Sequence, residues 1–153
     1  MPEVRFERGP CRETPMIRRT FAAQSAPEQS RGLAREVVGF LGQYLSDHNI
    51  LHDLDIMLTE ACANVARHAY RGGEGRLEVR LALVPGECVD LEIVDWGYGF
   101  DGPVRFENPS PEAEGGRGLF IISRLSDAVA VRSEGQENIV AIHKKIGKTA
   151  WKS

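Results

Sequence analysis

The sequence contains few cysteines, few aromatic residues and no excess of positive charge. Its three cysteines, Cys11, Cys62 and Cys88, lack C-x-x-C spacing, which argues against a disulfide framework and against a zinc site. A formal net charge of -3 gives no basic footprint, so direct nucleic-acid binding is not expected. No apolar run approaches the roughly 20 residues of a membrane helix, and the charged start does not resemble a secretory signal. We therefore expect a cytoplasmic protein without membrane contact.

The composition that remains is that of an ordinary globular domain, with 42% hydrophobic and 27% charged residues. A chain of 153 residues is long enough for one hydrophobic core, and we place this single domain over residues 16–146. Residues 1–15 mix charges with prolines and predict a partly ordered leader with one short strand over 4–7. Residues 147–153 are expected to form a polar tail.

Apolar spacing predicts two helices and two hairpins. The first helix should have Ser25 as N-cap, with Glu28 completing a capping box, and should run to about His48. The second should be capped by Asp53 and last to about Tyr70. Strands are expected at 16–23, 76–84, 88–95, 128–133 and 138–146, with a short helix over 118–125.

Three polar side chains follow one flank of the second predicted helix at four-residue intervals: Glu60, Asn64 and His68. At about 100° per residue, Glu60 and Asn64 lie beside the apolar stripe and His68 lies nearer its centre. A carboxylate and an amide one turn apart suit a general base and a ligand of Mg²⁺. The alternatives are a solvated flank with i, i+4 hydrogen bonds, and a hydrogen-bonded, partly buried His68.

Asp95 ends a hydrophobic strand, and Gly97 and Gly99 follow it closely. Alternation with Leu91 and Ile93 places Asp95 on the apolar side of the strand, where a carboxylate needs a hydrogen-bond donor. The two glycines let the backbone approach that donor, and the amino group of a purine is one candidate. The alternative is a strand-ending aspartate that caps a glycine turn.

Gly116, Arg117, Gly118 and Leu119 lie where an aperiodic, proline-rich stretch over 101–116 meets the short helix. A structureless stretch of this length in a small domain predicts a functional loop. Free amide groups at a helix start, with glycines beside them, suit phosphate groups, and Arg117 is placed to approach a terminal phosphate. A glycine cluster is also ordinary at a loop-to-helix junction.

In this order, the three motifs resemble the nucleotide-binding domain shared by gyrase-type topoisomerases, the ninety-kilodalton heat-shock chaperone, sensor histidine kinases and mismatch-repair ATPases. The stretches Thr59–Asn64, His68–Tyr70 and Gly118–Ile122 are most similar to the bacterial anti-sigma-factor serine kinases. The resemblance covers residues 16–146 and implies an α+β fold. In this Bergerat-type ATP-binding fold, helices pack on one side of a mixed, mostly antiparallel sheet to form a two-layer sandwich.

The resemblance also implies a role for each residue of the first two motifs. Asp95 would bind the adenine amino group of ATP, in a pocket shaped by Gly97 and Gly99. Glu60 would be the catalytic general base, and Asn64 would ligate Mg²⁺. Phosphoryl transfer requires mainly positioning and charge neutralisation, so a metal, a phosphate cradle and a base would suffice.

The third motif would bind the phosphates of ATP. Gly116 and Gly118 match the family's phosphate-binding glycines, and the loop before them would close over the nucleotide. Arg117, Leu119 and His68 complete the expected cofactor-binding residues. Family members phosphorylate a serine on a small anti-anti-sigma partner and otherwise hold a sigma factor inactive, usually as homodimers.

One departure concerns the last strand, where the family often has Gly-Thr and the threonine hydroxyl helps to bind adenine through water. Glu137-Asn138-Ile139 stands there in this chain, so Asn138 is the candidate substitute. Two other function classes remain: an ATP-binding module that sequesters a partner without catalysis, and an ATPase that uses water as acceptor. A histidine-kinase fragment is disfavoured. Its phosphoacceptor histidine would have to be His52, which lies only eight residues before Glu60, whereas histidine kinases carry this residue on a separate dimerisation hairpin well upstream.

Overall fold

The computed structural model describes residues 16–99, 104, 106, 107 and 117–153. Its elements are, in chain order, β1 (Ile17–Gln24), α1 (Pro27–Leu41), α2 (His48–Asn64), the π-helical turn η2 (Val65–Ala69), β2 (Arg76–Val84), β3 (Cys88–Asp95), α3 (Arg117–Leu125), β4 (Ala128–Glu134), β5 (Glu137–Lys145) and the 3-10 turn η3 (Lys148–Ala150). The strand expected over 4–7 and most of the loop expected over 101–116 lie outside the described residues. Of the helices described, none is both long and apolar enough to cross a membrane.

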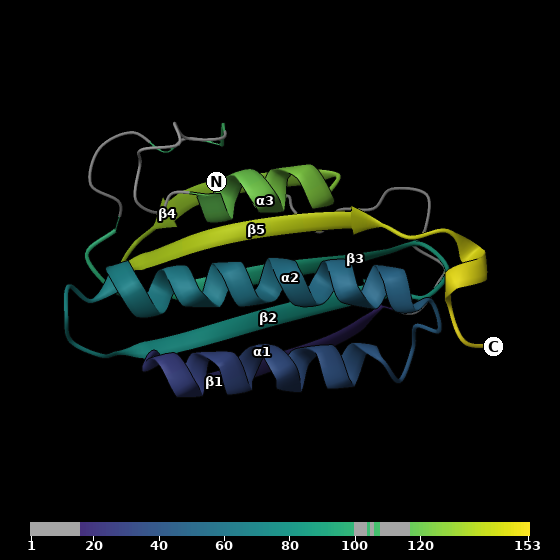
Figure 1. The fold of residues 1–153 in the computed structure, drawn as a ribbon, viewed down its shortest axis with the longest axis horizontal. Helices are drawn as coiled ribbons and strands as arrows, with labels where there is room; N and C mark the ends of the chain where they lie inside the picture. Colours follow the sequence, from purple (N-terminus) through teal and green to yellow (C-terminus); the bar gives the residue numbers. More distant parts are fainter. Residues whose placement is uncertain (1–15, 100–103, 105, 108–116) are drawn as a thin grey trace.

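The five strands form one sheet in the order β1-β2-β3-β5-β4, and the helices α1, α2 and α3 cover one of its faces (Figure 1). Alternate residues of the central strand β3, including Leu91 and Ile93, contribute to the core between the sheet and the helices. The predicted two-layer α+β architecture is confirmed. All pairings between the described strands are antiparallel, so the sheet is antiparallel rather than mixed.

Both predicted hairpins are confirmed, with β2 turning into β3 and β4 turning into β5. Gly86 and Gly135 lie in the two turns with φ of 85° and 60°, a left-handed conformation that favours glycine. The β3–β5 pairing places Asp95 directly opposite Asn138. This register joins the end of β3 to the start of β5 at the predicted binding motif.

The first helix differs from its prediction at both ends. No side chain caps α1, because the Ser25 hydroxyl instead accepts a hydrogen bond from the Gly75 amide at 3.1 Å. The Ser25 amide also donates to the Gly75 carbonyl at 2.9 Å, so Ser25 ties β1 to the approach of β2. α1 ends at Leu41 rather than near His48. The apolar spacing continued because Leu45, in the turn after the helix, is also buried in the core.

The second helix begins earlier than predicted. Asp47 caps α2, and its carboxylate accepts hydrogen bonds from the amides of Asn49 at 2.9 Å and Ile50 at 3.2 Å. Asp53, the expected cap, lies one turn inside the helix. Both aspartates precede apolar residues, and Asp47 prevails because it stands in extended backbone before the first turn.

Residues 147–153, for which a polar tail is expected, pack onto the domain. Within residues 147–153, Ala150 is buried, and its carbonyl accepts a hydrogen bond from the Ser46 amide at 2.7 Å. The Lys152 amide donates to the Tyr44 carbonyl at 2.8 Å. These contacts fasten the last residues to the connection between α1 and α2.

Candidate active site

Asp95 ends β3 with its carboxylate on the helix-covered side of the sheet and only 8% of the residue exposed. Its Oδ1 accepts two hydrogen bonds, from the Gly97 amide at 2.9 Å and from Asn138 Nδ2 at 2.9 Å. Through the first of these bonds, Asp95 caps the glycine turn, which was the alternative role expected for it. No described residue donates to Oδ2, so this oxygen is left for a ligand or for solvent. Capping and ligand binding are therefore compatible, because each uses a different oxygen.

The glycine loop after Asp95 lies directly against the end of the second helix. A Cβ at Gly97 would lie 2.0 Å from the Ala69 carbonyl oxygen, so only glycine fits there. The next amide, that of Tyr98, donates to the same carbonyl at 2.8 Å. Gly99 has a φ of 85°, and a Cβ on it would lie 3.3 Å from Asn138 Oδ1. The loop is thus held between η2 and β5.

Tyr70 supports this loop from the side, a role that no sequence motif indicated. Its hydroxyl accepts a hydrogen bond from the Trp96 amide at 2.9 Å and donates to the Arg76 carbonyl at 2.6 Å. Its ring occupies the space beside Gly75, where a Cβ would lie 2.2 Å from ring carbon. Burial raises the pKa of Tyr70, the Trp96 hydrogen bond acts against this, and the charge of Asp95 adds to it. The only sequence signal was an aromatic residue at the end of a helix, shortly before a glycine.

The flank of α2 meets the start of α3 at Gly118. A Cβ on Gly118 would lie 3.2 Å from Glu60 Oε1 and 3.4 Å from Asn64 Nδ2. Glu60 and Asn64 are half-buried and Gly118 is buried. Two motifs 54 residues apart (118 − 64) therefore converge. A carboxylate and an amide beside a helix start can serve proton transfer, metal ligation and anion binding.

The π-helical turn η2 changes the direction of the side chains that follow Asn64. A π-helix has more residues per turn than an α-helix, so positions calculated at 100° per residue are shifted after Asn64. Ala69 is buried and His68 is exposed. The expectation that His68 lies nearer the centre of the apolar stripe is therefore wrong. Its predicted contact with a cofactor stays a prediction.

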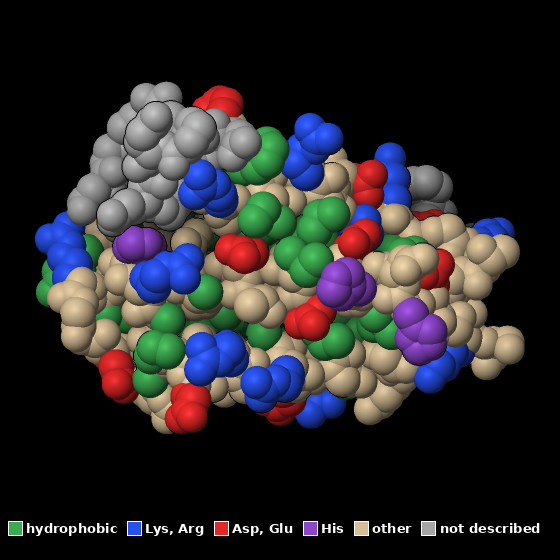
Figure 2. All heavy atoms as spheres, in the orientation of Figure 1, with side chains coloured by type: hydrophobic (Ala, Val, Ile, Leu, Met, Phe, Trp, Pro, Cys, Tyr) green, Lys and Arg blue, Asp and Glu red, His purple; other side chains and the backbone are tan. Residues whose placement is uncertain are grey.

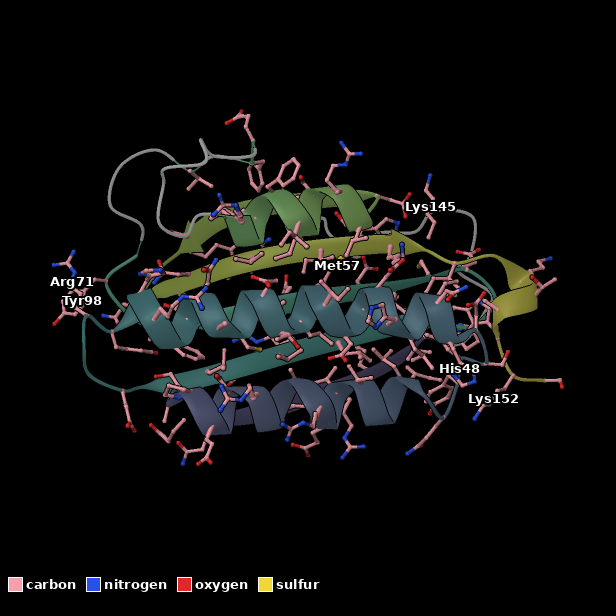
Figure 3. All side chains as sticks on the ribbon, in the orientation of Figure 1. His48, Met57, Arg71, Tyr98, Lys145 and Lys152 are labelled. Atoms are coloured by element: carbon pink, nitrogen blue, oxygen red, sulfur yellow. The ribbon has the colours of Figure 1, made fainter. Side chains whose placement is uncertain are left out.

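Exposed cationic side chains surround this end of the molecule. Arg67, Arg71 and Arg117 are exposed, and Figure 2 shows Lys and Arg side chains at this end of the helical face. The Arg71 guanidinium stacks on the Tyr98 ring at 4.4 Å, and Figure 3 shows the pair beyond the end of α2. Such a field favours an anionic ligand or partner.

The remaining site residues of the third motif divide into two groups. Leu119 is buried and its side chain belongs to the core, which leaves its backbone as the part available to a ligand. Gly116 lies outside the described residues. Roles in nucleotide binding for both residues stay predictions.

Residues 23–144 match the family described as the histidine kinase-like ATPase domain. The chain is 34% identical over 95 residues to the serine-protein kinase RsbW of Bacillus pumilus, a match that covers 54% of this chain and 58% of that protein. It is 30% identical over 113 residues to RsbW of Halalkalibacterium halodurans, covering 67% of this chain and 68% of that protein. The chain thus spans little more than half of several curated relatives.

A solved structure shows the same fold. The RsbU and RsbW domains of Rv1364c from Mycobacterium tuberculosis align with a TM-score of 0.54 at 18% identity, covering 86% of this chain and 32% of that chain. The matches to the family and to RsbW agree with the resemblance that the motifs indicated. The proximity of Glu60 and Asn64 to Gly118 agrees with it as well. The chain belongs to the histidine kinase-like ATPase domain family, in the branch that includes the serine-protein kinases RsbW.

Proposed function

We propose that this protein is an Mg-ATP-dependent serine kinase that acts as an anti-sigma factor. It would phosphorylate a serine on a small anti-anti-sigma protein and otherwise hold a sigma factor inactive. The observation that carries the proposal is the convergence of Glu60 and Asn64 on Gly118. The RsbW relatives support the reaction class. A homodimer and a cytoplasmic location belong to the same proposal.

The adenine ring would be recognised by Asp95. Its Oδ1 is already bonded to Gly97 and Asn138, so Oδ2 is the acceptor left for the exocyclic amino group. The two hydrogen bonds to Oδ1 hold the carboxylate, and the Gly97 that donates one of them packs closely on Ala69. A guanine base presents a carbonyl oxygen at the corresponding position and would face a carboxylate, which disfavours it.

The donor set at the other end of the site fits Mg²⁺ and phosphate. Asn64 offers an amide oxygen, a ligand type that Mg²⁺ accepts, and the α3 start offers amides beside Gly118. When bound, Mg²⁺ would neutralise charge on the phosphates. Asn64 would hold the metal, and the residues around Gly118 would orient the terminal phosphate.

Glu60 would act as the general base. As the serine oxygen of the acceptor protein forms its bond to the terminal phosphorus, Glu60 would take the hydroxyl proton, and the bond from phosphorus to the ADP oxygen would break. The position of Glu60 beside Gly118 supports this role, because Gly118 belongs to the proposed phosphate-binding motif. The half-buried setting of the side chain limits competition from water.

The test is a phosphorylation assay with labelled ATP, Mg²⁺ and candidate anti-anti-sigma proteins. Wild type should transfer label to a serine, and Glu60→Gln should lose about 10²–10⁴-fold in rate while retaining ATP binding. ATP binding without transfer to any candidate, for wild type and variant alike, would favour the alternative of a non-catalytic ATP-binding module. Light scattering with and without ATP tests the dimer.

A second measurement addresses the metal. Asn64→Ala should weaken ATP binding in the presence of Mg²⁺ more than in its absence, because only the metal-dependent complex uses the amide oxygen. Calorimetric titrations in Mg²⁺ and in chelator give the two affinities. Equal losses under both conditions would contradict the metal role of Asn64.

A further inference from the structure

The sheet face opposite the helices carries a cluster of three potential metal ligands, far from the site described above. Cys88, Asp90 and His143 each offer one ligand atom, and these atoms all lie within 4.8 Å of one another. They supply a sulfur, a carboxylate oxygen and an imidazole nitrogen. Over the part of the chain that the structure describes, this is the one group of three such side chains that meets this distance.

Strand geometry explains why these residues meet. Cys88 and Asp90 are two residues apart on β3, so their side chains point to the same face. Val89, between them, points into the helix-covered core. Asp90 pairs directly with His143 on β5, which brings the imidazole alongside. All three donors therefore stand on paired strands, the kind of rigid support that a metal site requires.

The exposed edge of the imidazole gives an ion access to the cluster. Cys88 and Asp90 are each 2% exposed, whereas the His143 side chain is 26% exposed, so access is from the imidazole side. The residues opposite Asp90 and His143 on the outer strands are Ala82 and Ala128, which have the smallest side chains other than glycine. Within the sheet, the neighbours of Asp90 and His143 on these two strands are therefore small.

We propose that Cys88, Asp90 and His143 form a binding site for a zinc-class divalent ion, with water as the fourth ligand. Thiolate and imidazole together select zinc or cobalt over Mg²⁺ and Ca²⁺, which prefer oxygen ligands. His143 Nδ1 and Asp90 Oδ1 now lie 2.6 Å apart in a hydrogen bond. Metal–ligand bonds of about 2.0–2.3 Å in a tetrahedron place ligand atoms roughly 3.3–3.8 Å apart, so coordination replaces that bond.

The proposed ion is separate from the Mg²⁺ expected at Asn64. Cys88 begins β3 and Asp95 ends it, seven residue steps (95 − 88) or about 23 Å along an extended strand. The two sites also lie on opposite faces of the sheet. The zinc site joins β3 to β5, so its occupancy stabilises the sheet and leaves the nucleotide pocket unchanged.

The test uses the full chain under reducing conditions without nucleotide, so it is independent of the proposed kinase activity. Zn²⁺ is titrated by calorimetry, and Co²⁺ serves as a spectroscopic probe because a cobalt–thiolate bond gives a charge-transfer absorption. Wild type should bind one Zn²⁺, show this absorption with Co²⁺, and unfold at a higher temperature when zinc is present.

Matched variants separate this site from its neighbours. Cys88→Ser and His143→Gln should each weaken Zn²⁺ binding by more than the about 10–100-fold typical of losing an outer-shell partner, and Cys88→Ser should abolish the absorption. Cys62→Ser and His52→Ala remove the same chemistry from α2 and should bind as wild type. Because His143 is partly exposed, its variant should stay folded even if Cys88→Ser does not, which circular dichroism checks.

Three results would overturn the proposal: no cobalt–thiolate absorption in wild type, zinc affinity unchanged in the folded His143→Gln variant, or a loss in Cys62→Ser equal to that in Cys88→Ser. Asp90→Asn adds a finer measure. Replacing the carboxylate by an amide should weaken Zn²⁺ binding by about tenfold or more, because an amide is a poorer zinc ligand.

Discussion

At the residue scale, Asn138 occupies one oxygen of Asp95 and leaves the other for the proposed contact with adenine. Its Nδ2 donates to Asp95 Oδ1 at 2.9 Å and to the Gly97 carbonyl at 3.2 Å. One amide group thus holds both the carboxylate and the loop after it. The family's threonine reaches adenine through water, whereas Asn138 contacts the aspartate directly. This chain therefore still has a hydrogen-bond donor where the family often has threonine, but the donor is an amide that contacts Asp95.

Replacing Asn138 by aspartate should strongly weaken ATP binding. The change removes the donor and puts a second carboxylate within hydrogen-bond distance of Asp95, and adjacent like charges disfavour ionisation of both. We expect at least a tenfold loss of affinity at neutral pH, measured by calorimetry. Asn138→Thr replaces the amide donor with the hydroxyl donor common in the family, and it should lose less ATP affinity. If Asn138→Asp binds ATP as tightly as wild type, Asn138 does not contribute to ATP binding.

Asp95→Asn tests base recognition itself. The amide can present a donor where the adenine amino group needs an acceptor, and loss of a charged hydrogen bond costs about 1.5–3 kcal/mol. The ATP dissociation constant should therefore rise by roughly 10–150-fold, and the preference for ATP over GTP should shrink. The comparison needs both nucleotides, because a general loss of folding would reduce both affinities equally. Unchanged ATP affinity would refute the assignment.

At the element scale, the glycine loop after Asp95 packs against η2. This contact connects Asp95 to the helix that carries Glu60 and Asn64. Gly97→Ala would place a Cβ 2.0 Å from the Ala69 carbonyl, so the loop or the helix end must move. We expect the thermal unfolding temperature to fall and ATP affinity to drop at least tenfold. Gly39→Ala is the matched control, because no atom lies within 4 Å of its Cβ and a helical alanine stabilises by about 0.5–1 kcal/mol. Equal behaviour of the two variants would contradict this account.

Local patterns predicted the helices and strands but not how side chains far apart in sequence share hydrogen bonds. Ser25 and Glu28 have capping-box spacing, yet the Ser25 hydroxyl bonds Gly75, which is 50 residues away. The apolar spacing of α2 continued past Asn64, so it could not reveal the π-helical turn. Which residue caps a helix and where its geometry changes both depend on tertiary partners.

The same distinction applies to the site. The resemblance of the motifs to a known family implied that Glu60, Asn64 and Gly118 belong to one site, and the structure brings the three residues close together. The bond from Asn138 to Asp95 depends on the β3–β5 register, which no local pattern encodes. The absence of C-x-x-C spacing likewise hid the Cys88 cluster, whose third member comes from another strand.

At the scale of the whole molecule, the two faces of the sheet differ in composition: one is apolar and the other carries many charged side chains. The helix-covered face holds the core, and the motifs proposed to bind the nucleotide lie at one end of it. The opposite face carries a network of ion pairs: Arg80 contacts Glu137 at 2.8 Å and Arg132 contacts Glu92 at 2.9 Å. Because these charges are paired across strands, the stability of this face depends on pH.

Glu78 should contribute to that pH dependence. Burial acts to raise the pKa of Glu78, but hydrogen bonds from Arg76 and Arg80 outweigh it, so its folded pKa lies below the ordinary value of 4.5. A depressed carboxyl pKa stabilises the fold above the unfolded pKa, and this stabilisation is lost as pH falls through the folded pKa. Glu78→Gln should therefore unfold more easily at neutral pH, by less than about 1 kcal/mol because its partners are partly exposed.

Urea unfolding from pH 7 down to pH 3 measures the effect. The gap in unfolding free energy between wild type and Glu78→Gln should narrow below about pH 4.5, since protonation makes the wild-type side chain neutral as well. Glu36→Gln, an exposed carboxylate on α1, serves as the control for loss of one negative charge. If the gap stays constant over this range, or if Glu36→Gln produces the same narrowing, the stabilisation does not come from the hydrogen bonds that Arg76 and Arg80 donate to Glu78.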